Sequence, residues 1–201
     1  MGEDFLEELA SGEPTPGGGA ASAVLVAMAA ALVAMVCRLT VGRPRYRDHE
    51  DVLGAVLGEA DQARSQAVAL AQADSDAYRG VIDALALPRE DEDQRRERTA
   101  RVQVCLREAT EVPLATLDVA GQVASLLERA TGRVNPHAAS DLAVAAHTVR
   151  AALDAATLNV ETNLARITDE GYAGVARTRA EEVAAAARGA LARVADAPTS
   201  A

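Results

Sequence analysis

The chain has very few aromatic residues and no lysine. Its 201 residues include no tryptophan, one phenylalanine and three tyrosines, whereas 47 are alanine. Alanine favours helices and has little side chain to pack on a pleated surface, so the composition excludes a β-sandwich or a β-barrel. With 49% hydrophobic residues, the chain is also unlike a disordered protein. The length is typical of one domain, and we expect residues 1–201 to form a single helical domain.

Positive charge and cysteine are both scarce. Twenty arginines stand against 30 acidic residues, which gives a net charge of −10. This balance argues against a nucleic-acid partner and against adhesion to an anionic membrane. Cys37 and Cys105 lie in apolar, helical stretches and form no Cys-x-x-Cys pair, so we expect two reduced core thiols in a cytoplasmic protein. The three histidines show no spacing typical of a metal site, and we expect no metal.

One stretch of the chain is free of charge. Residues 20–37 are eighteen residues without a charged side chain, which is the threshold length for a membrane span. Eight of them are alanine, which is only weakly apolar. We therefore predict a central helix wrapped by other helices. Because the chain has few large side chains, one bundle would not cover this helix fully, and we expect a homodimer.

Hydrophobic spacing and breakers predict an all-α bundle of about seven helical segments around this helix. Pro113 is expected to kink or restart a helix, and Pro136 to open one. The predicted segments are residues 4–11, 20–40, 48–87, 89–112, 114–130, 136–167 and 172–194.

Two local features could carry chemistry. The first is a glycine loop, Thr15-Pro16-Gly17-Gly18-Gly19, directly before the buried helix. Glycines permit positive φ and close approach to a ligand, and a helix N-terminus can bind an anion or a carbonyl. We expect a β-branched residue at Gly18 to abolish ligand binding. The alternative is a simple hinge.

The second feature is a pair of acids within one helix. Asp74 and Asp76 are two residues apart, so they point to different faces. A helical wheel places Asp74 on the apolar side and Asp76 among polar residues. A carboxyl group facing the core would have a raised pKa and would suit general acid catalysis, so spacing alone selects Asp74.

Motifs along residues 4–172 resemble the cyclodeaminase/cyclohydrolase family of folate enzymes. The motifs that carry the resemblance are Pro14-Thr15-Pro16-Gly17-Gly18-Gly19, Met35-Val36-Cys37-Arg38-Leu39-Thr40, Ala73-Asp74-Ser75-Asp76-Ala77-Tyr78, Ala109-Thr110-Glu111-Val112-Pro113-Leu114, Ser140-Asp141 and Asn159-Val160-Glu161-Thr162-Asn163-Leu164.

The resemblance implies a helical homodimer that acts on a one-carbon tetrahydrofolate without a metal or redox cofactor. A cyclodeaminase releases ammonia from 5-formiminotetrahydrofolate to form 5,10-methenyltetrahydrofolate, and a cyclohydrolase opens the methenyl ring with water. The second acid of the Asp-x-Asp-Ala segment, Asp76, would be catalytic, with Asp74 as the second candidate. The glycine loop would line the substrate site. Further candidates for binding the substrate are Arg43, Tyr46, Asn135, Ser140 and Asp141. Arg45 and Arg47 are additional candidates for binding the glutamate of a folate.

Two departures from the family pattern leave other functions open. Val134 stands where the family often has glycine before Asn135, and Ala20 stands where a serine often follows the glycine run. The first could alter a turn, and the second removes a hydroxyl group. The alternatives are an enzyme that opens or closes an amidine or imine on a non-folate substrate, and a non-catalytic helical interaction protein.

Overall fold

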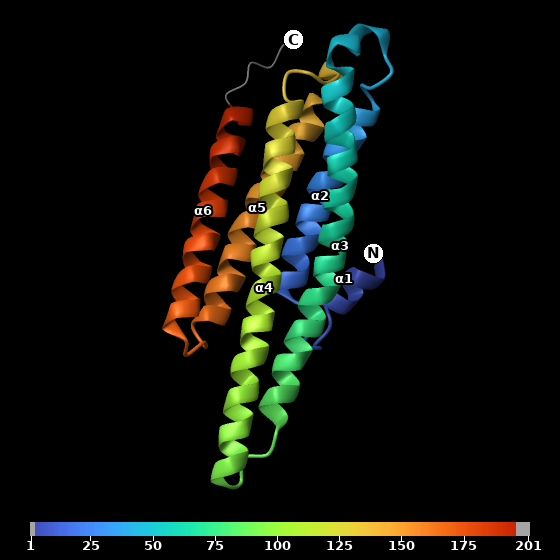
Figure 1. Cartoon of the computed structure of the whole chain (residues 1–201). Helices are drawn as coiled ribbons and strands as arrows, with labels where there is room; N and C mark the ends of the chain where they lie inside the picture. Colours follow the sequence, from blue (N-terminus) through green and yellow to red (C-terminus); the bar gives the residue numbers. More distant parts are fainter. Residues whose placement is uncertain (1–2, 196–201) are drawn as a thin grey trace.

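Long helices running side by side make up the computed structural model, which describes residues 3–195 (Figure 1). Within that range there are six α-helices, two short 3₁₀ helices and no strand. The all-α prediction is confirmed, although about seven helical segments were expected. The elements are α1 (Glu3–Leu9), α2 (Gly18–Arg38), η1 (Pro44–His49), α3 (Glu50–Ala86), α4 (Glu92–Ala130), η2 (Pro136–Ala138), α5 (Ala139–Leu164) and α6 (Glu170–Ala195).

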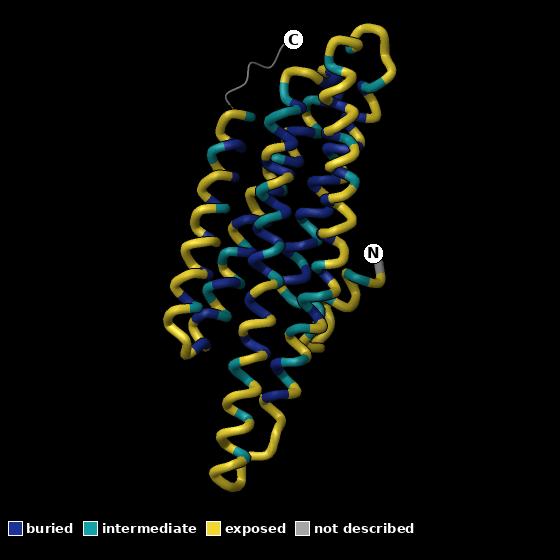
Figure 2. The backbone as a smooth tube through the Cα atoms, viewed as in Figure 1, coloured by how far each residue is buried: buried dark blue, intermediate teal, exposed yellow. Residues whose placement is uncertain are grey.

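The alanine-rich helix α2 lies inside the bundle, as predicted. It packs against α3, α4 and α5, and its valines and alanines form the centre of the main core (Figure 2). By length and composition it is the one helix within residues 3–195 that could cross a membrane, but 61% of its most apolar window is buried inside the bundle. Small side chains let the neighbouring helices approach closely. Cys37 and Cys105 are buried and unpaired, and burial raises the pKa of the Cys37 thiol to about 11.

Pro113 does not divide the fourth helix, which corrects the predicted boundary between residues 112 and 114. Helix α4 is 39 residues long and continues through this proline without a break. A proline lacks the N–H that would bond the carbonyl four residues earlier, here that of Ala109. The side chain of Asn163 on α5 donates to that oxygen instead, at 2.9 Å. Tertiary packing thus supplies the hydrogen bond that the helix has lost.

Removing this donor should destabilise the fold. We expect Asn163→Ala to lower the free energy of unfolding by about 1–3 kcal/mol, because a partly buried carbonyl is left without its partner. Chemical denaturation would measure the loss. Thr162→Ala is the matched control, since the exposed Thr162 hydroxyl bonds only back to Leu158 of its own helix. Equal stability of the two variants would show that water satisfies Ala109.

The tip formed by α3 and α4 extends beyond the rest of the bundle (Figure 1). Residues 89–96 lie there; they carry charges of both signs and are mostly exposed. Asp91 caps α4 by accepting a hydrogen bond from the Gln94 N–H at 2.8 Å. This tip lies away from the ends of α2, where the predicted site residues are found.

Candidate functional site

The glycine loop, residues 15–19, ends where α2 begins, and Asp74 of α3 lies against it. A Cβ atom built on Gly19 would stand 2.0 Å from a carboxylate oxygen of Asp74, so a side chain at this position would force Asp74 or the loop to move. The Ala20 N–H donates a hydrogen bond to the same carboxyl group. Residues 15–17 are half-buried, Gly18 is exposed and Gly19 is buried. The loop and Asp74 therefore form one compact structure at the N-terminus of α2.

The positive φ predicted for the glycines is not found in the loop. Within residues 3–195, positive φ occurs only at Gly42 and Gly132, not in the loop. A Cβ on Gly18 would meet only the Asn159 side-chain oxygen, at an ordinary 3.9 Å. Gly19, and not Gly18, is thus the position where a side chain would overlap a neighbour, and that neighbour is Asp74.

Asp74 has the environment of a proton carrier. Burial raises the pKa of its carboxyl group above the usual aspartate range, and the hydrogen bond from Ala20 offsets only part of that shift. The first N–H groups of a helix have no partner within the helix, so the loop also offers donors for a carbonyl or an anion. A carboxyl group that readily holds a proton beside such donors can protonate a leaving nitrogen.

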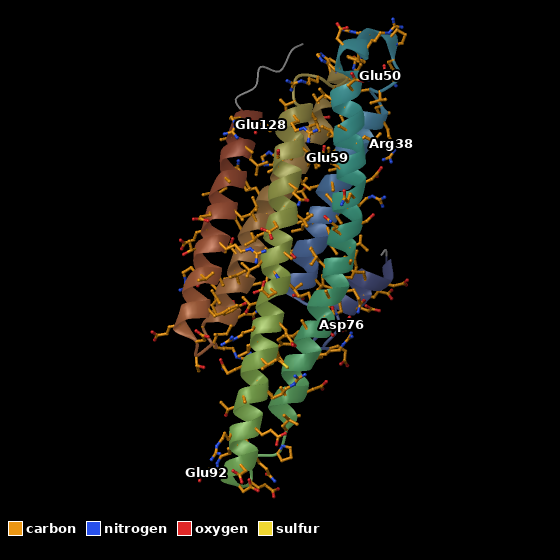
Figure 3. All side chains as sticks on the ribbon, viewed as in Figure 1. Arg38, Glu50, Glu59, Asp76, Glu92 and Glu128 are labelled. Carbon is orange, nitrogen blue, oxygen red and sulfur yellow. The ribbon has the colours of Figure 1, made fainter. Side chains whose placement is uncertain are left out.

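Asp76 points to another face of α3, as the helical wheel indicated. Its side chain is 58% exposed, and it pairs with Arg79 at 2.9 Å and accepts a hydrogen bond from Gln72 at 3.0 Å. Figure 3 labels it on α3. The structure therefore separates the two acids: Asp74 lies against the glycine loop, whereas Asp76 forms its hydrogen bonds and its ion pair with neighbours on its own helix.

Asn159 is a site residue that the sequence analysis did not select. Its Nδ2 donates to the Ala155 carbonyl at 2.9 Å, which leaves Oδ1 directed at Gly18. It comes from α5, on the other side of α2 from Asp74. Asn159 begins one of the motifs that carry the family resemblance, residues 159–164. A single asparagine within a helix, however, has no characteristic spacing that identifies it as a site residue.

The remaining predicted residues gather at the opposite end of α2. The Tyr46 hydroxyl lies 3.5 Å from Asn135 Oδ1, and the Asn135 N–H donates to the buried Thr40 hydroxyl at 3.0 Å. The Arg45 guanidinium lies over the Tyr46 ring, 5.8 Å from its centre. Arg43 is exposed, and Ser140 and Asp141 stand in the first turn of α5. We call residues 42–47 the arginine turn.

The two departures from the family pattern leave this local structure intact. The turn before Asn135 takes its positive φ at Gly132, so it does not need a glycine at position 134. Val134 is buried and belongs to the core. Ala20 is fully buried, and its backbone still reaches Asp74. Neither departure gives a structural reason for a different substrate.

The two groups of predicted residues are far apart within one chain. Helix α2 separates them, and its 21 residues span about 30 Å at 1.5 Å per residue. Figure 1 shows the arginine turn at one end of the bundle and the start of α2 about halfway along it. One subunit thus brings Asp74, Asn159 and the glycine loop together, but it does not bring Arg43, Tyr46 or Asn135 to them.

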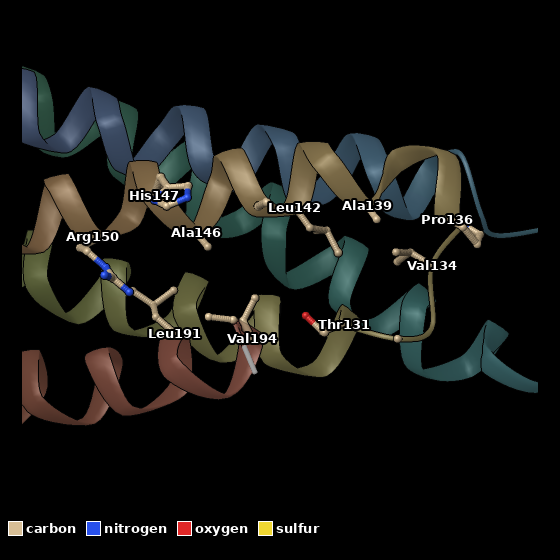
Figure 4. A pocket seen from close by; sticks show the side chains of 13 residues that line it. Thr131, Val134, Pro136, Ala139, Leu142, Ala146, His147, Arg150, Leu191 and Val194 are labelled. Atoms are coloured by element: carbon tan, nitrogen blue, oxygen red, sulfur yellow. The ribbon is translucent and has the colours of Figure 1, made fainter. Parts of the chain in front are cut away.

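A cavity of about 290 Å³ lies between α5 and the ends of α4 and α6 (Figure 4). Its lining is mostly apolar, with His147 and Arg150 at one side. It contains neither Asp74 nor the glycine loop. Among the described residues, no group of three or more histidine, cysteine, aspartate or glutamate side chains could hold a metal ion.

Comparison with protein families gives one match along most of the chain. Residues 1–182 match the family model described as formiminotransferase-cyclodeaminase. The chain is 39% identical to the methenyltetrahydrofolate cyclohydrolase of Methylorubrum extorquens, over 85% of this chain and 82% of that protein. It is 30% identical to the formimidoyltransferase-cyclodeaminase of Rattus norvegicus, over 87% of this chain but only 32% of that protein.

A solved structure shares the fold. The crystal structure of formiminotetrahydrofolate cyclodeaminase from Thermotoga maritima superposes with a TM-score of 0.88 and 31% sequence identity, and the match covers 96% of this chain and 93% of that one. The likeness therefore extends over the whole bundle.

Proposed function

Because the chain belongs to the formiminotransferase-cyclodeaminase family, we propose that it is a folate enzyme that forms or hydrolyses 5,10-methenyltetrahydrofolate. The observation that carries this proposal is the contact between Asp74 and the glycine loop at the N-terminus of α2. The cyclohydrolase relative, which this chain covers almost fully, supports the same substrate.

Both reactions need a proton carrier beside a tetrahedral carbon. In hydrolysis, water adds to the methenyl carbon and a base takes one of its protons. N5 is then protonated as the C–N5 bond breaks, and the remaining hydroxyl proton is released to solvent, which leaves 10-formyltetrahydrofolate. In deamination, N10 attacks the formimino carbon, and the nitrogen that leaves as ammonia is protonated. We assign both proton transfers to Asp74, because its carboxyl group faces the loop whereas Asp76 faces solvent.

The proposal needs no metal and no redox cofactor, because one carboxyl group moves the protons. The proposal also includes that the protein is a homodimer and that it is located in the cytoplasm. The two unpaired, buried cysteines support a reducing compartment. The charge-free stretch of α2, residues 20–37, keeps part of one face exposed in a single chain, which supports self-association.

Absorbance at the methenyltetrahydrofolate band tests the activity directly. Purified protein is given 5,10-methenyltetrahydrofolate in one cuvette and 5-formiminotetrahydrofolate in another. Loss of the band in the first, above the uncatalysed rate, indicates cyclohydrolase activity, and its appearance in the second indicates cyclodeaminase activity. If neither rate exceeds the rate without enzyme, the chain does not act on these folates.

The raised pKa of Asp74 predicts a pH effect on stability. A carboxyl group whose pKa is higher in the folded than in the unfolded protein stabilises the fold at low pH, and that contribution is lost as pH rises through the folded value. We therefore expect Asp74→Asn to gain thermal stability relative to wild type as pH rises above about 4, the usual aspartate pKa. Melting temperatures of both proteins across rising pH would measure it. If the melting temperature of wild type instead rises relative to that of the variant as pH rises, the fold stabilises the charged form of Asp74.

A further inference from the structure

The cavity between α5 and the ends of α4 and α6 has no part in the chemistry proposed above, and we call it the Arg150 cavity (Figure 4). Most of its wall is apolar, and the larger apolar side chains come from Val134, Leu142, Leu191 and Val194. None of the described residues that line it is acidic, although 30 residues of the chain are. The interior therefore favours an apolar group, and no carboxylate of the lining repels an anion.

Arg150 is the charged group best placed to bind such an anion. Its side chain extends from α5 toward α6 (Figure 4), and within the described part of the chain it forms no ion pair. Asp154 stands four residues later, a spacing at which the two could pair. It binds Arg188 of α6 instead, at 2.8 Å. The Arg150 guanidinium thus keeps its paired donors for a carboxylate from outside the chain.

His147 adds a second donor at the same side of the cavity. It stands one turn before Arg150 on α5 and lines the same space. An imidazole carries at least one N–H whether it is neutral or charged, so it can donate to an oxygen in either state. Two donors next to an apolar space suit a molecule with a polar head and an apolar body. The head would lie at the exposed rim, and the body would fill the interior.

The volume of the cavity limits the size of this molecule. About 290 Å³ is at the small end of ligand pockets, which run from about 300 to 1,000 Å³. At about 30 Å³ for each group the size of a water molecule, the space holds about ten non-hydrogen atoms. A folate, which joins a pterin, a benzoyl group and a glutamate, is much larger. The Arg150 cavity is therefore too small for the proposed substrate.

Val134, one of the two departures from the family pattern, forms part of this wall. Val134 and Pro136 both line the cavity. Asn135 between them is held on another side, where its N–H donates to the Thr40 hydroxyl at 3.0 Å and its Oδ1 lies 3.5 Å from the Tyr46 hydroxyl. A glycine at position 134 would leave the cavity without this side chain. The valine thus adds apolar surface at a place where the family often has none.

We propose that the Arg150 cavity binds a small carboxylic acid with an apolar body and about ten non-hydrogen atoms. Arg150 and His147 bind the carboxylate, and Leu142 and Leu191 pack against the body. The bound acid contacts both neighbours of Asn135 in the chain. This site is separate from the glycine loop, and it does not depend on the proposed function.

Calorimetric titration of the whole protein with sodium octanoate, an unbranched acid of this size, tests the proposal. Wild type should show saturable binding of one octanoate per chain. Octan-1-ol, which has the same chain without the charge, should bind at least about tenfold more weakly, as should octanoate to Arg150→Ala. Ala146→Phe places a ring in the cavity and should abolish binding.

Arg101→Ala is the matched control. Arg101 is also exposed and forms no ion pair among the described residues, but it lies about 40 Å along α4 from Ala130. This variant should bind octanoate as wild type does. Circular dichroism checks that each variant is folded, and if Ala146→Phe does not fold, the two arginine variants still decide the result.

Three outcomes would overturn the proposal. The first is heat that never saturates with wild type, because octanoate then only partitions onto the surface. The second is equal affinity of wild type and Arg150→Ala. The third is displacement of octanoate by 5-formyltetrahydrofolate, which would place the cavity within the folate site. Each outcome is independent of folate turnover, so the proposed function can fail while octanoate still binds.

Discussion

Asp74→Asn is expected to lower kcat for folate turnover at least about 10²-fold, with a much smaller change in KM. Asparagine keeps the shape of the side chain and can still accept the hydrogen bond from Ala20, but it cannot carry a proton. The lost interaction acts in the transition state, so the effect falls on kcat. Steady-state kinetics on the methenyl band would measure it, with circular dichroism to confirm the fold.

Asp76→Asn is the matched control two residues along the same helix. It removes an exposed ion pair with Arg79, and exposed pairs contribute little to stability, so we expect kcat within about twofold of wild type. The opposite result, an inactive Asp76→Asn and an active Asp74→Asn, would restore the role that the family motif assigns to Asp76. Normal turnover by both variants would place the proton carrier elsewhere.

Gly19→Ala is expected to abolish turnover almost completely. The added Cβ would stand 2.0 Å from the Asp74 carboxylate, so either the loop or Asp74 must move. Each movement separates the acid from the start of α2, and a displacement of about 1 Å at a catalytic group can cost about 10²-fold in rate. We also expect a lower melting temperature, because the overlap lies in a buried part of the loop.

Gly18→Ala is the control for this variant. Its Cβ would meet only Asn159 Oδ1, at 3.9 Å, so the fold and most of the activity should be retained. Measuring both variants in one assay separates a steric requirement at one position from a general need for flexibility. If Gly18→Ala were as inactive as Gly19→Ala, the substrate itself would require the space above Gly18.

Helical periodicity predicted the two acids well. The wheel placed Asp74 and Asp76 on different faces because their relation depends only on turns within one helix, and the structure shows Asp76 beside Gln72 and Arg79. The requirement for Gly19 was not predictable in the same way. It arises from a carboxylate 55 residues later in the chain, and glycine in a sequence gives no sign of what approaches it.

Pro113 shows a second limit. Local propensity correctly identifies proline as a helix breaker, but it cannot include a donor from another helix. The separation of the arginine turn from the glycine loop is a third case. Both lie next to α2 in the sequence, and only the length of that helix, once its ends are known, shows that they cannot meet in one chain.

The hydrogen bond from Asn163 to the Ala109 carbonyl links two positions in their effects on stability. With Pro113→Ala in place, the helix would bond Ala109 by itself, and replacement of Asn163 would then cost little, so the two substitutions should be strongly non-additive. The same coupling constrains the order of change in a lineage. An ancestor that acquired the asparagine first could accept the proline at little cost, whereas the reverse order passes through a destabilised protein.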